Sequence, residues 1–95
     1  MSLKKAYAGT FESNDIYITI EEKPQDHGVQ IELQSIVLAQ FGQSIKNTIT
    51  ETIASCGITT GLQIEANDKG ALPCTIEART KTALSRLGLI KEGQS

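Results

Sequence analysis

A single serine, Ser13, is the residue of this chain that is best placed to take part in chemistry. Residues 12–15 read Glu-Ser-Asn-Asp and are all turn formers, and apolar stretches flank them, one ending at Phe11 and the other beginning at Ile16. A tight hairpin needs a positive φ near its tip, which Asn14 adopts more readily than most residues with a Cβ. The pattern predicts an exposed hydroxyl at the tip of a hairpin. Such a group suits covalent modification by another enzyme better than catalysis, which favours a cleft.

The other reactive side chains form no recognisable catalytic or metal site. His27 is the only histidine and lies in a loop-like segment, so we expect it to face solvent, with neither a Ser–His–Asp triad nor a zinc site. Cys56 and Cys74 belong to no Cys-x-x-Cys motif and are expected to be buried or half-buried thiols in a reducing compartment. Glu12 and Asp15 are expected to be solvated turn carboxylates, although they could also attract a modifying enzyme. The sequence therefore predicts no catalytic residues, no metal and no independent enzyme.

Length and composition limit the possible classes of protein. With 95 residues the chain is expected to form one domain, spanning 1–95. Its formal net charge is −2 and it has no basic run, which disfavours nucleic-acid binding. It also lacks the run of about 20 apolar residues that a membrane-spanning helix requires, so we expect a cytoplasmic protein without a membrane partner.

Alternating apolar and polar residues predict four strands. Residues 6–12 and 15–22 flank the polar turn and are expected to be the first two. Residues 29–34 repeat the alternation and are expected to form a third strand with one solvent-exposed face. A fourth strand is expected over 60–66, followed by an Asn-Asp-Lys-Gly turn at 67–70.

Apolar residues that recur every three or four positions predict a long helix between Ser35 and Gly57. Ser35 is expected to be its N-cap, because a serine hydroxyl can accept from an exposed backbone N–H. Gly57 is expected to end it in the left-handed conformation. The apolar stripe of this helix consists of Leu38, Phe41, Ile45, Ile49, Ile53 and Cys56.

Residues 71–78 fit either an alternating strand or a second helix. Pro73 favours the helix, because proline suits the first helical turn and would interrupt a strand ladder. We therefore expect a helix over about 73–88, ended by Gly88, and a frayed tail over residues 91–95. The element order β-β-β-α-β-α predicts an α+β fold, with a small sheet of about four strands and two helices packed on one face.

Three segments, in matching order and spacing, carry a resemblance to a known family. They are Ala8-Gly9-Thr10-Phe11-Glu12-Ser13-Asn14-Asp15, Gln40-Phe41-Gly42 and Asn67-Asp68-Lys69-Gly70-Ala71-Leu72. Over nearly its whole length the chain resembles the acyl carrier protein, or gamma subunit, of citrate lyase. The resemblance implies that Ser13 carries a phosphoribosyl-dephospho-CoA group in phosphodiester linkage, and that the thiol of this group carries an acetyl or citryl thioester.

The resemblance also implies partners. These are the transferase (alpha) and lyase (beta) subunits of citrate lyase and the transferase that attaches the prosthetic group. The chain itself would be a non-catalytic acyl carrier domain while citrate is cleaved to oxaloacetate and acetate. Lys69 could contact the phosphates of the group, or residues 67–70 could be a structural turn whose glycine needs a positive φ; we favour the second.

Two other functions remain open at this stage. The acyl carrier subunit of malonate decarboxylase uses the same kind of prosthetic group. A protein-interaction or regulatory module that is never modified is the second alternative, because serine is common in turns and the pattern alone is also that of an ordinary turn serine.

Overall fold

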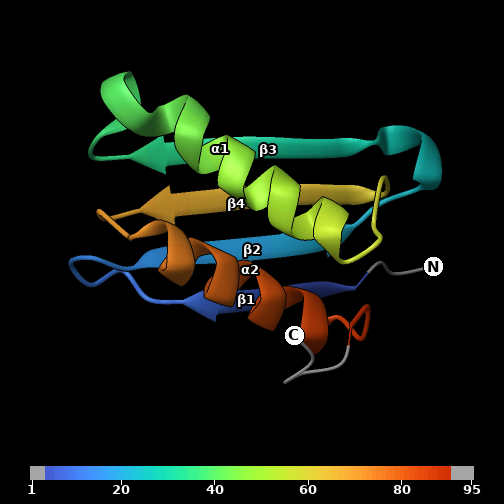
Figure 1. The fold of residues 1–95 in the computed structure, drawn as a ribbon. Coiled ribbons are helices and arrows are strands. Elements are labelled where there is room, and N and C mark those ends of the chain that lie inside the picture. Colours follow the sequence, from blue (N-terminus) through green and yellow to red (C-terminus); the bar gives the residue numbers. More distant parts are fainter. Residues whose placement is uncertain (1–3, 91–95) are drawn as a thin grey trace.

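The structure, a computed structural model, describes residues 4–90 and contains four strands and two long helices, as predicted. In chain order these are β1 (Lys5–Gly9), β2 (Ile16–Glu22), the short 3-10 helix η1 (Gln25–His27), β3 (Val29–Ser35), α1 (Leu38–Ser55), β4 (Leu62–Asp68) and α2 (Pro73–Arg86). Figure 1 shows both long helices on one face of the sheet, so the α+β fold class is confirmed. The frayed tail expected from residue 91 lies outside the described residues.

The strands form one mixed sheet in the order β1-β2-β4-β3. β1 and β4 both pair antiparallel with β2, while β3 pairs parallel with β4. Asp68 at the end of β4 lies opposite both Ile16, the first residue of β2, and Ser35, the last residue of β3. The loop that contains Ser13 and the start of both helices therefore lie at the same end of the sheet, on the left of Figure 1.

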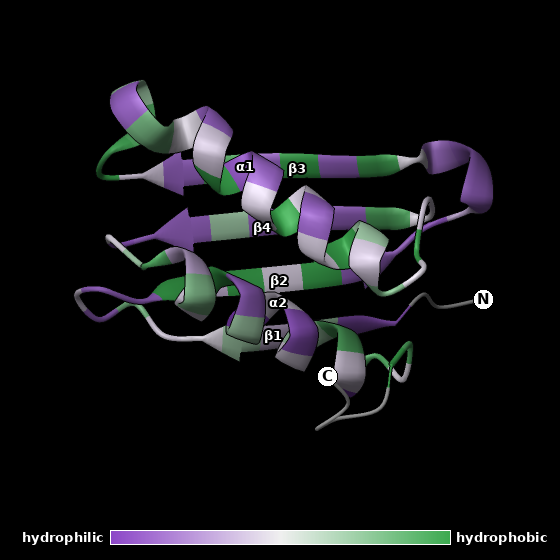
Figure 2. Ribbon diagram, in the orientation of Figure 1, coloured by the Kyte–Doolittle hydropathy of each residue, from purple (hydrophilic) through white to green (hydrophobic). Residues whose placement is uncertain are grey.

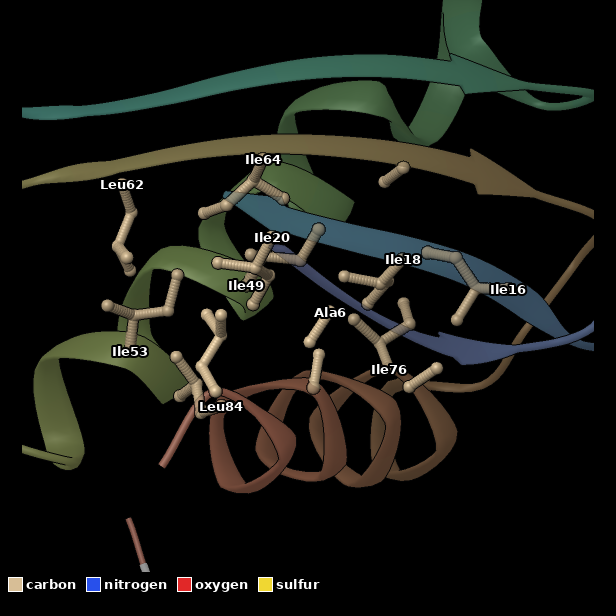
Figure 3. Close-up of a cluster of buried hydrophobic side chains, with 14 of the residues drawn as sticks. Ala6, Ile16, Ile18, Ile20, Ile49, Ile53, Leu62, Ile64, Ile76 and Leu84 are labelled. Carbon is tan, nitrogen blue, oxygen red and sulfur yellow. The ribbon is translucent and has the colours of Figure 1, made fainter. Parts of the chain in front are cut away.

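The core lies between the sheet and the two helices. Ile16, Ile18 and Ile20 of β2 are fully buried, as the period of two along a half-covered strand predicts. Ile49 and Ile53 of α1 pack against them from the helix side, with further apolar side chains of β4 and α2 (Figure 3). Hydropathy along the ribbon follows this arrangement, since apolar positions alternate along β2 and recur at helical spacing in α1 (Figure 2).

Glycines end both helices in the same way. Gly57 has φ +83° and Gly88 has φ +82°, the left-handed conformation expected for a residue just past a helix. The N–H of Gly57 donates to the carbonyl of Ala54, and that of Gly88 donates to Ser85, each over 2.9 Å. Pro73 is the first residue of α2, which settles the strand-or-helix alternative for residues 71–78 in favour of the helix.

Three predicted boundaries are wrong. The first strand ends at Gly9 instead of residue 12, because the backbone of Gly9 turns to φ +99° and passes so close to the Ile16 carbonyl that a Cβ would overlap it. The fourth strand runs over Leu62–Asp68 instead of 60–66, because β4 is central and its last two residues still pair with both neighbours. Ser35 is the last residue of β3 and not the N-cap of α1, which is Val37.

The predicted apolar stripe of α1 is buried only in part. Ile45, Ile49 and Ile53 are core residues, whereas Leu38 and Phe41 are exposed. The first turn of α1 extends past the edge strand β3 in the view of Figure 1, where there is no sheet to cover it. The start of α1 therefore presents apolar side chains to solvent.

Candidate functional site

Ser13 lies in a tight turn and is exposed, as the sequence predicts. The N–H of Asp15 donates to the carbonyl of Glu12 over 3.3 Å, which closes a four-residue turn with Ser13 in its second position. Asn14, in the third position, has φ +65°, the only positive φ among the non-glycine residues that the structure describes. Within residues 4–90 the Ser13 side chain makes no hydrogen bond, so its hydroxyl is accessible to a modifying enzyme.

Backbone hydrogen bonds attach this turn to the loop between β4 and α2. Asn14 donates its N–H to the carbonyl of Lys69 over 2.8 Å, and Lys69 donates back to the carbonyl of Asp15 over 2.9 Å. Gly70 follows with φ +94°, which confirms that this glycine is needed for its backbone conformation; residues 67 and 68 of the predicted turn, however, belong to β4. The tip of the hairpin is thus held on a neighbouring loop instead of projecting alone.

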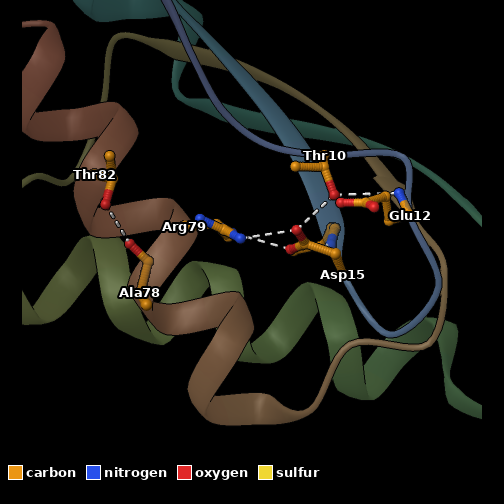
Figure 4. Close-up of polar contacts among 7 residues, drawn as sticks. Thr10, Glu12, Asp15, Ala78, Arg79 and Thr82 are labelled. Atoms are coloured by element: carbon orange, nitrogen blue, oxygen red, sulfur yellow. Dashed lines mark hydrogen bonds and ion pairs between the residues drawn. The ribbon is translucent and has the colours of Figure 1, made fainter.

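Asp15 is a structural anchor of the turn and not a solvated carboxylate, so that expectation is wrong. It is only 8% exposed and accepts two hydrogen bonds from Arg79 of α2, from Nε over 3.0 Å and from a terminal nitrogen over 2.8 Å. The hydroxyl of Thr10 and the N–H of Ile16 donate to the same carboxylate, each over 2.7 Å. Figure 4 shows this cluster, in which one carboxylate joins both sides of the turn to α2.

These hydrogen bonds determine the charge state of Asp15. The guanidinium of Arg79 is the main cause that lowers the pKa of Asp15 from its ordinary value of 3.8 to about 2; Thr10 and the Ile16 N–H act in the same direction, while burial opposes them. The pKa of Arg79 is raised by the same pair. The two groups are therefore fully ionised at neutral pH, and this planar two-bond contact fixes orientation as well as distance.

A second buried carboxylate supports the other loops at this end. Asp68 accepts from the Ser35 hydroxyl over 2.8 Å and from the N–H of Ala71 over 2.9 Å. The Ser35 hydroxyl in turn accepts from the N–H of Val37, over 3.1 Å. Ser35 therefore receives a backbone N–H as predicted, but as part of the link between β3, β4 and the start of α1.

At this end of the molecule each face of the sheet has a hollow. On the helix side an apolar cleft of about 430 Å³ lies between the first turns of α1 and α2, with Phe41, Leu72 and Ile76 among its lining residues. On the uncovered side a hollow of about 360 Å³ is lined by Phe11 and Tyr17 together with polar side chains. Both are surface features close to the Ser13 turn.

The remaining residues that the sequence singles out lie away from Ser13. His27 is half-buried, and its Nε2 is 2.9 Å from Oε1 of Gln63, so it is not the solvent-facing residue expected. Cys56 is half-buried as expected, whereas Cys74 is exposed on the first turn of α2. Among residues 4–90 no three His, Cys, Asp or Glu side chains converge as metal ligands, and no helix is long and apolar enough to cross a membrane.

Arg79 and Thr10 hold Asp15 at the candidate site, and neither is expected there from the sequence. Arg79 is 64 residues from Asp15, and no local pattern links the two. The available signal is weak: Arg79 lies between Ile76 and Thr80, which are both buried, so an arginine at this place flanks the packed face of α2.

Comparisons with known proteins match this chain to one family model and to several named relatives. A family model described as "Malonate decarboxylase delta subunit (MdcD)" matches residues 3–87. The chain is 52% identical over 81 residues to the citrate lyase acyl carrier protein of Lacticaseibacillus casei (strain BL23), covering 85% of this chain and 77% of that one. It is 48% identical over 87 residues to the protein of the same name from Halothermothrix orenii, covering 90% and 89%. The corresponding Streptococcus mutans protein is 44% identical over 93 residues, covering 96% and 88%.

A solved structure has the same fold. It is a chain of the crystal structure of a Pseudomonas malonate decarboxylase hetero-tetramer in complex with malonate. The match has a TM-score of 0.65 and 17% sequence identity, and it covers 92% of this chain and 89% of the other. At this identity the likeness concerns the arrangement of strands and helices.

Proposed function

The chain belongs to the family of citrate lyase acyl carrier proteins, and from that premise we propose that Ser13 is the residue through which it carries the acyl group. The observation that carries the proposal is the exposed Ser13 hydroxyl, free of hydrogen bonds within residues 4–90, on a turn that is held at both sides. A carrier needs an anchor that is open to a modifying enzyme and fixed relative to the rest of the subunit. The Ser13 turn has both properties.

The group proposed for Ser13 is phosphoribosyl-dephospho-CoA, attached by a phosphodiester. The turn fits such a group, since a serine hydroxyl forms a phosphate ester and open space surrounds it. When bound, the group supplies a thiol that holds the acyl unit as a thioester. An oxygen linkage at Ser13 is chemically distinct from that thioester, so acyl exchange at the thiol leaves the anchor intact.

This chain's own residues position the anchor. Arg79 and Asp15 fix the base of the turn on α2, and the two backbone bonds between Lys69 and the turn fix its tip on the neighbouring loop. A tethered acyl group stays at high effective concentration near the active sites of bound subunits. We therefore infer a non-catalytic role, in which bond making is left to the partner subunits.

The proposed partners are the transferase (alpha) and lyase (beta) subunits of citrate lyase, and the transferase that attaches the prosthetic group. All of them must reach the end of the molecule where Ser13 lies. That end also exposes Ile36, Leu38 and Leu72, large apolar side chains of the kind found where proteins meet.

The intact mass of protein co-expressed with its modifying enzymes tests the assignment of Ser13. We expect the mass of the prosthetic group on the wild-type chain and on Ser44→Ala, a matched change of an exposed serine on α1, and its complete loss in Ser13→Ala. Ser13→Ala should fold normally, because Ser13 makes no side-chain contact that the fold needs. A label that persists in Ser13→Ala, or a Ser13→Ala protein that still supports citrate cleavage, would contradict the proposal. The second result would favour an unmodified interaction module.

A second candidate is the carrier subunit of malonate decarboxylase. The description of the matching family model favours it, and the identity of 44–52% to citrate lyase carriers opposes it. Loaded protein can be supplied in turn with the catalytic subunits of each enzyme. Turnover of citrate without malonate is expected, and the reverse would exchange the two candidates.

A further inference from the structure

We propose that the hollow on the uncovered face of the sheet, beside Phe11 and Tyr17, binds the adenine ring of the prosthetic group attached to Ser13. This inference rests on the proposed function and adds to it a binding site on this chain. The site would hold the nucleoside part of the group and leave the thiol end free. Its ligand class is an uncharged purine base, presented on a short covalent link.

The aromatic side chains at this place form a platform. The ring of Phe11 stacks on that of Tyr17 with centroids 4.6 Å apart and an angle of 28° between their planes, and Tyr7 continues the row 6.0 Å from Tyr17. Phe11 is nevertheless 59% exposed, so part of its surface remains open. A purine base gains free energy by stacking on such a surface, since both partners are flat and apolar on their faces.

The polar residues of the hollow suit a neutral base better than a phosphate. Amide groups of Gln34 and Asn67 lie in it, with Nδ2 of Asn67 donating to Oε1 of Gln34 over 3.3 Å. The carboxylates of Glu32 and Glu65 are also part of the lining, which includes no basic residue. Carboxylates and amide oxygens accept hydrogen bonds from the exocyclic amine of adenine and repel anionic groups. The phosphates would therefore stay outside the hollow.

The distance between anchor and platform is short. Phe11 precedes Ser13 by two residues, which places their Cα atoms at most about 7 Å apart. In the proposed group the phosphoribosyl unit joins the serine to the adenosine part, so the base is the first large ring that the turn meets. The apolar cleft on the other face offers hydroxyls and one ring, and its carboxylate Asp68 already accepts two hydrogen bonds. That cleft is the poorer match for adenine.

Proton NMR spectra of the loaded protein test the proposal directly. The adenine protons should shift upfield from their positions in free dephospho-CoA, because they would lie over aromatic rings. The shift should fall at least twofold in Phe11→Leu. It should be unchanged in Phe41→Leu, a matched control that removes a phenylalanine of similar exposure on the helix side. Nuclear Overhauser effects between the adenine protons and the rings of Phe11 and Tyr17 are expected in the loaded wild type, and they test the stacking without any variant.

Tyrosine fluorescence gives a second readout. The chain has no tryptophan and only two tyrosines, Tyr7 and Tyr17, both in the aromatic row. Loading Ser13 should therefore quench the emission of the protein, and Phe11→Leu should weaken this quenching more than Phe41→Leu does.

Intact mass, measured first on each sample, separates the possible failures. A chain that carries no group on Ser13 would overturn both the proposed function and this inference. A fully loaded chain whose adenine protons have the free positions would overturn this inference and leave the proposed function standing. Resonances of Phe11 that shift with concentration in unloaded protein would show that a second copy occupies the hollow, and would also overturn it.

Discussion

The two ends of the sheet contain the same kinds of element, but different interactions hold the helix ends and loops at each. At the far end from Ser13 both helices close on glycines, Gly57 and Gly88, whose N–H groups satisfy helix carbonyls. At the Ser13 end neither α1 nor α2 has a side-chain cap at its start. This end instead uses two buried carboxylates, Asp15 and Asp68, to hold its loops.

The same contrast holds for exposed apolar side chains. Phe11, Ile36, Leu38, Phe41 and Leu72 all lie at or beside the Ser13 end. At the far end Leu89 is the one large apolar residue among those described that is exposed to a comparable degree. An end that only had to be stable would gain nothing from this exposure, so the difference supports the proposal that partner proteins bind at the Ser13 end.

The largest difference between the ends should appear when one glycine at each is replaced. Gly9→Ala places a Cβ on the Ile16 carbonyl and should lower the free energy of unfolding by about 3 kcal/mol or more. Gly57→Ala meets open space and should lower it by only about 1 kcal/mol, from the positive φ alone. Urea unfolding monitored by circular dichroism measures both. Equal losses in the free energy of unfolding would contradict the expected difference between the two ends.

Removing a loop-holding carboxylate should have the next largest effect. Asp68→Ala leaves the half-buried Ser35 hydroxyl and Ala71 N–H without their acceptor, and should lower the free energy of unfolding by about 2 kcal/mol. The control Asp26→Ala changes an exposed aspartate in η1 and should stay within about 0.5 kcal/mol of the wild type. A loss of the same size in both variants would refute the structural role of Asp68.

The ion pair of Asp15 and Arg79 should give a stability that depends on pH. The folded-state pKa of Asp15, about 2, lies below its ordinary value of 3.8, so the contribution is complete above about pH 5 and is lost as the pH falls toward 2. Because Arg79 is partly exposed, we expect roughly 1 kcal/mol, less than the pKa shift alone would give.

Arg79→Gln tests this expectation. The variant should be less stable at neutral pH and should lose less of its remaining stability between pH 5 and pH 2, as followed by thermal unfolding. Lys23→Gln breaks a partly exposed pair with Glu21, at 3.4 Å near the far end, and should change stability by less than about 0.5 kcal/mol. Parallel pH curves for the wild type and Arg79→Gln would contradict the assignment.

The smallest effect on stability is expected at the exposed apolar residues. Leu72→Ser should change the free energy of unfolding by less than about 0.5 kcal/mol, because its side chain is already in solvent. It should, however, reduce the binding of a fluorescent hydrophobic dye, while Leu89→Ser at the far end should not. Equal dye binding by the two variants would argue against a functional difference between the ends.

Local chemistry explains which parts of the fold could be predicted from the sequence. The Ser13 turn, the left-handed residues Asn14 and Gly57, and the start of α2 at Pro73 each depend on one or two neighbouring residues. The alternation that buries β2 is equally local. These features were predicted correctly for that reason.

The rest depends on contacts between distant residues. The burial of Asp15 requires Arg79, and the exposure of Phe41 depends on where the sheet stops beneath α1. The strand order is also non-local, because β4 inserts between two strands that precede it in the chain. A periodic pattern states which face of a helix is apolar but not how much of that face a neighbour covers.

The central position of β4 has a consequence for how the protein is made. Until the ribosome has released residues 62–68, β3 has no partner and the β1–β2 hairpin stands alone, a unit that is only marginally stable in water. We therefore expect the amides of β2 and β3 to gain protection from pulsed hydrogen exchange together during refolding, and early protection of β3 alone would contradict this. A nascent chain would therefore present Ser13 to the modifying enzyme in its folded turn only after β4 has been synthesised.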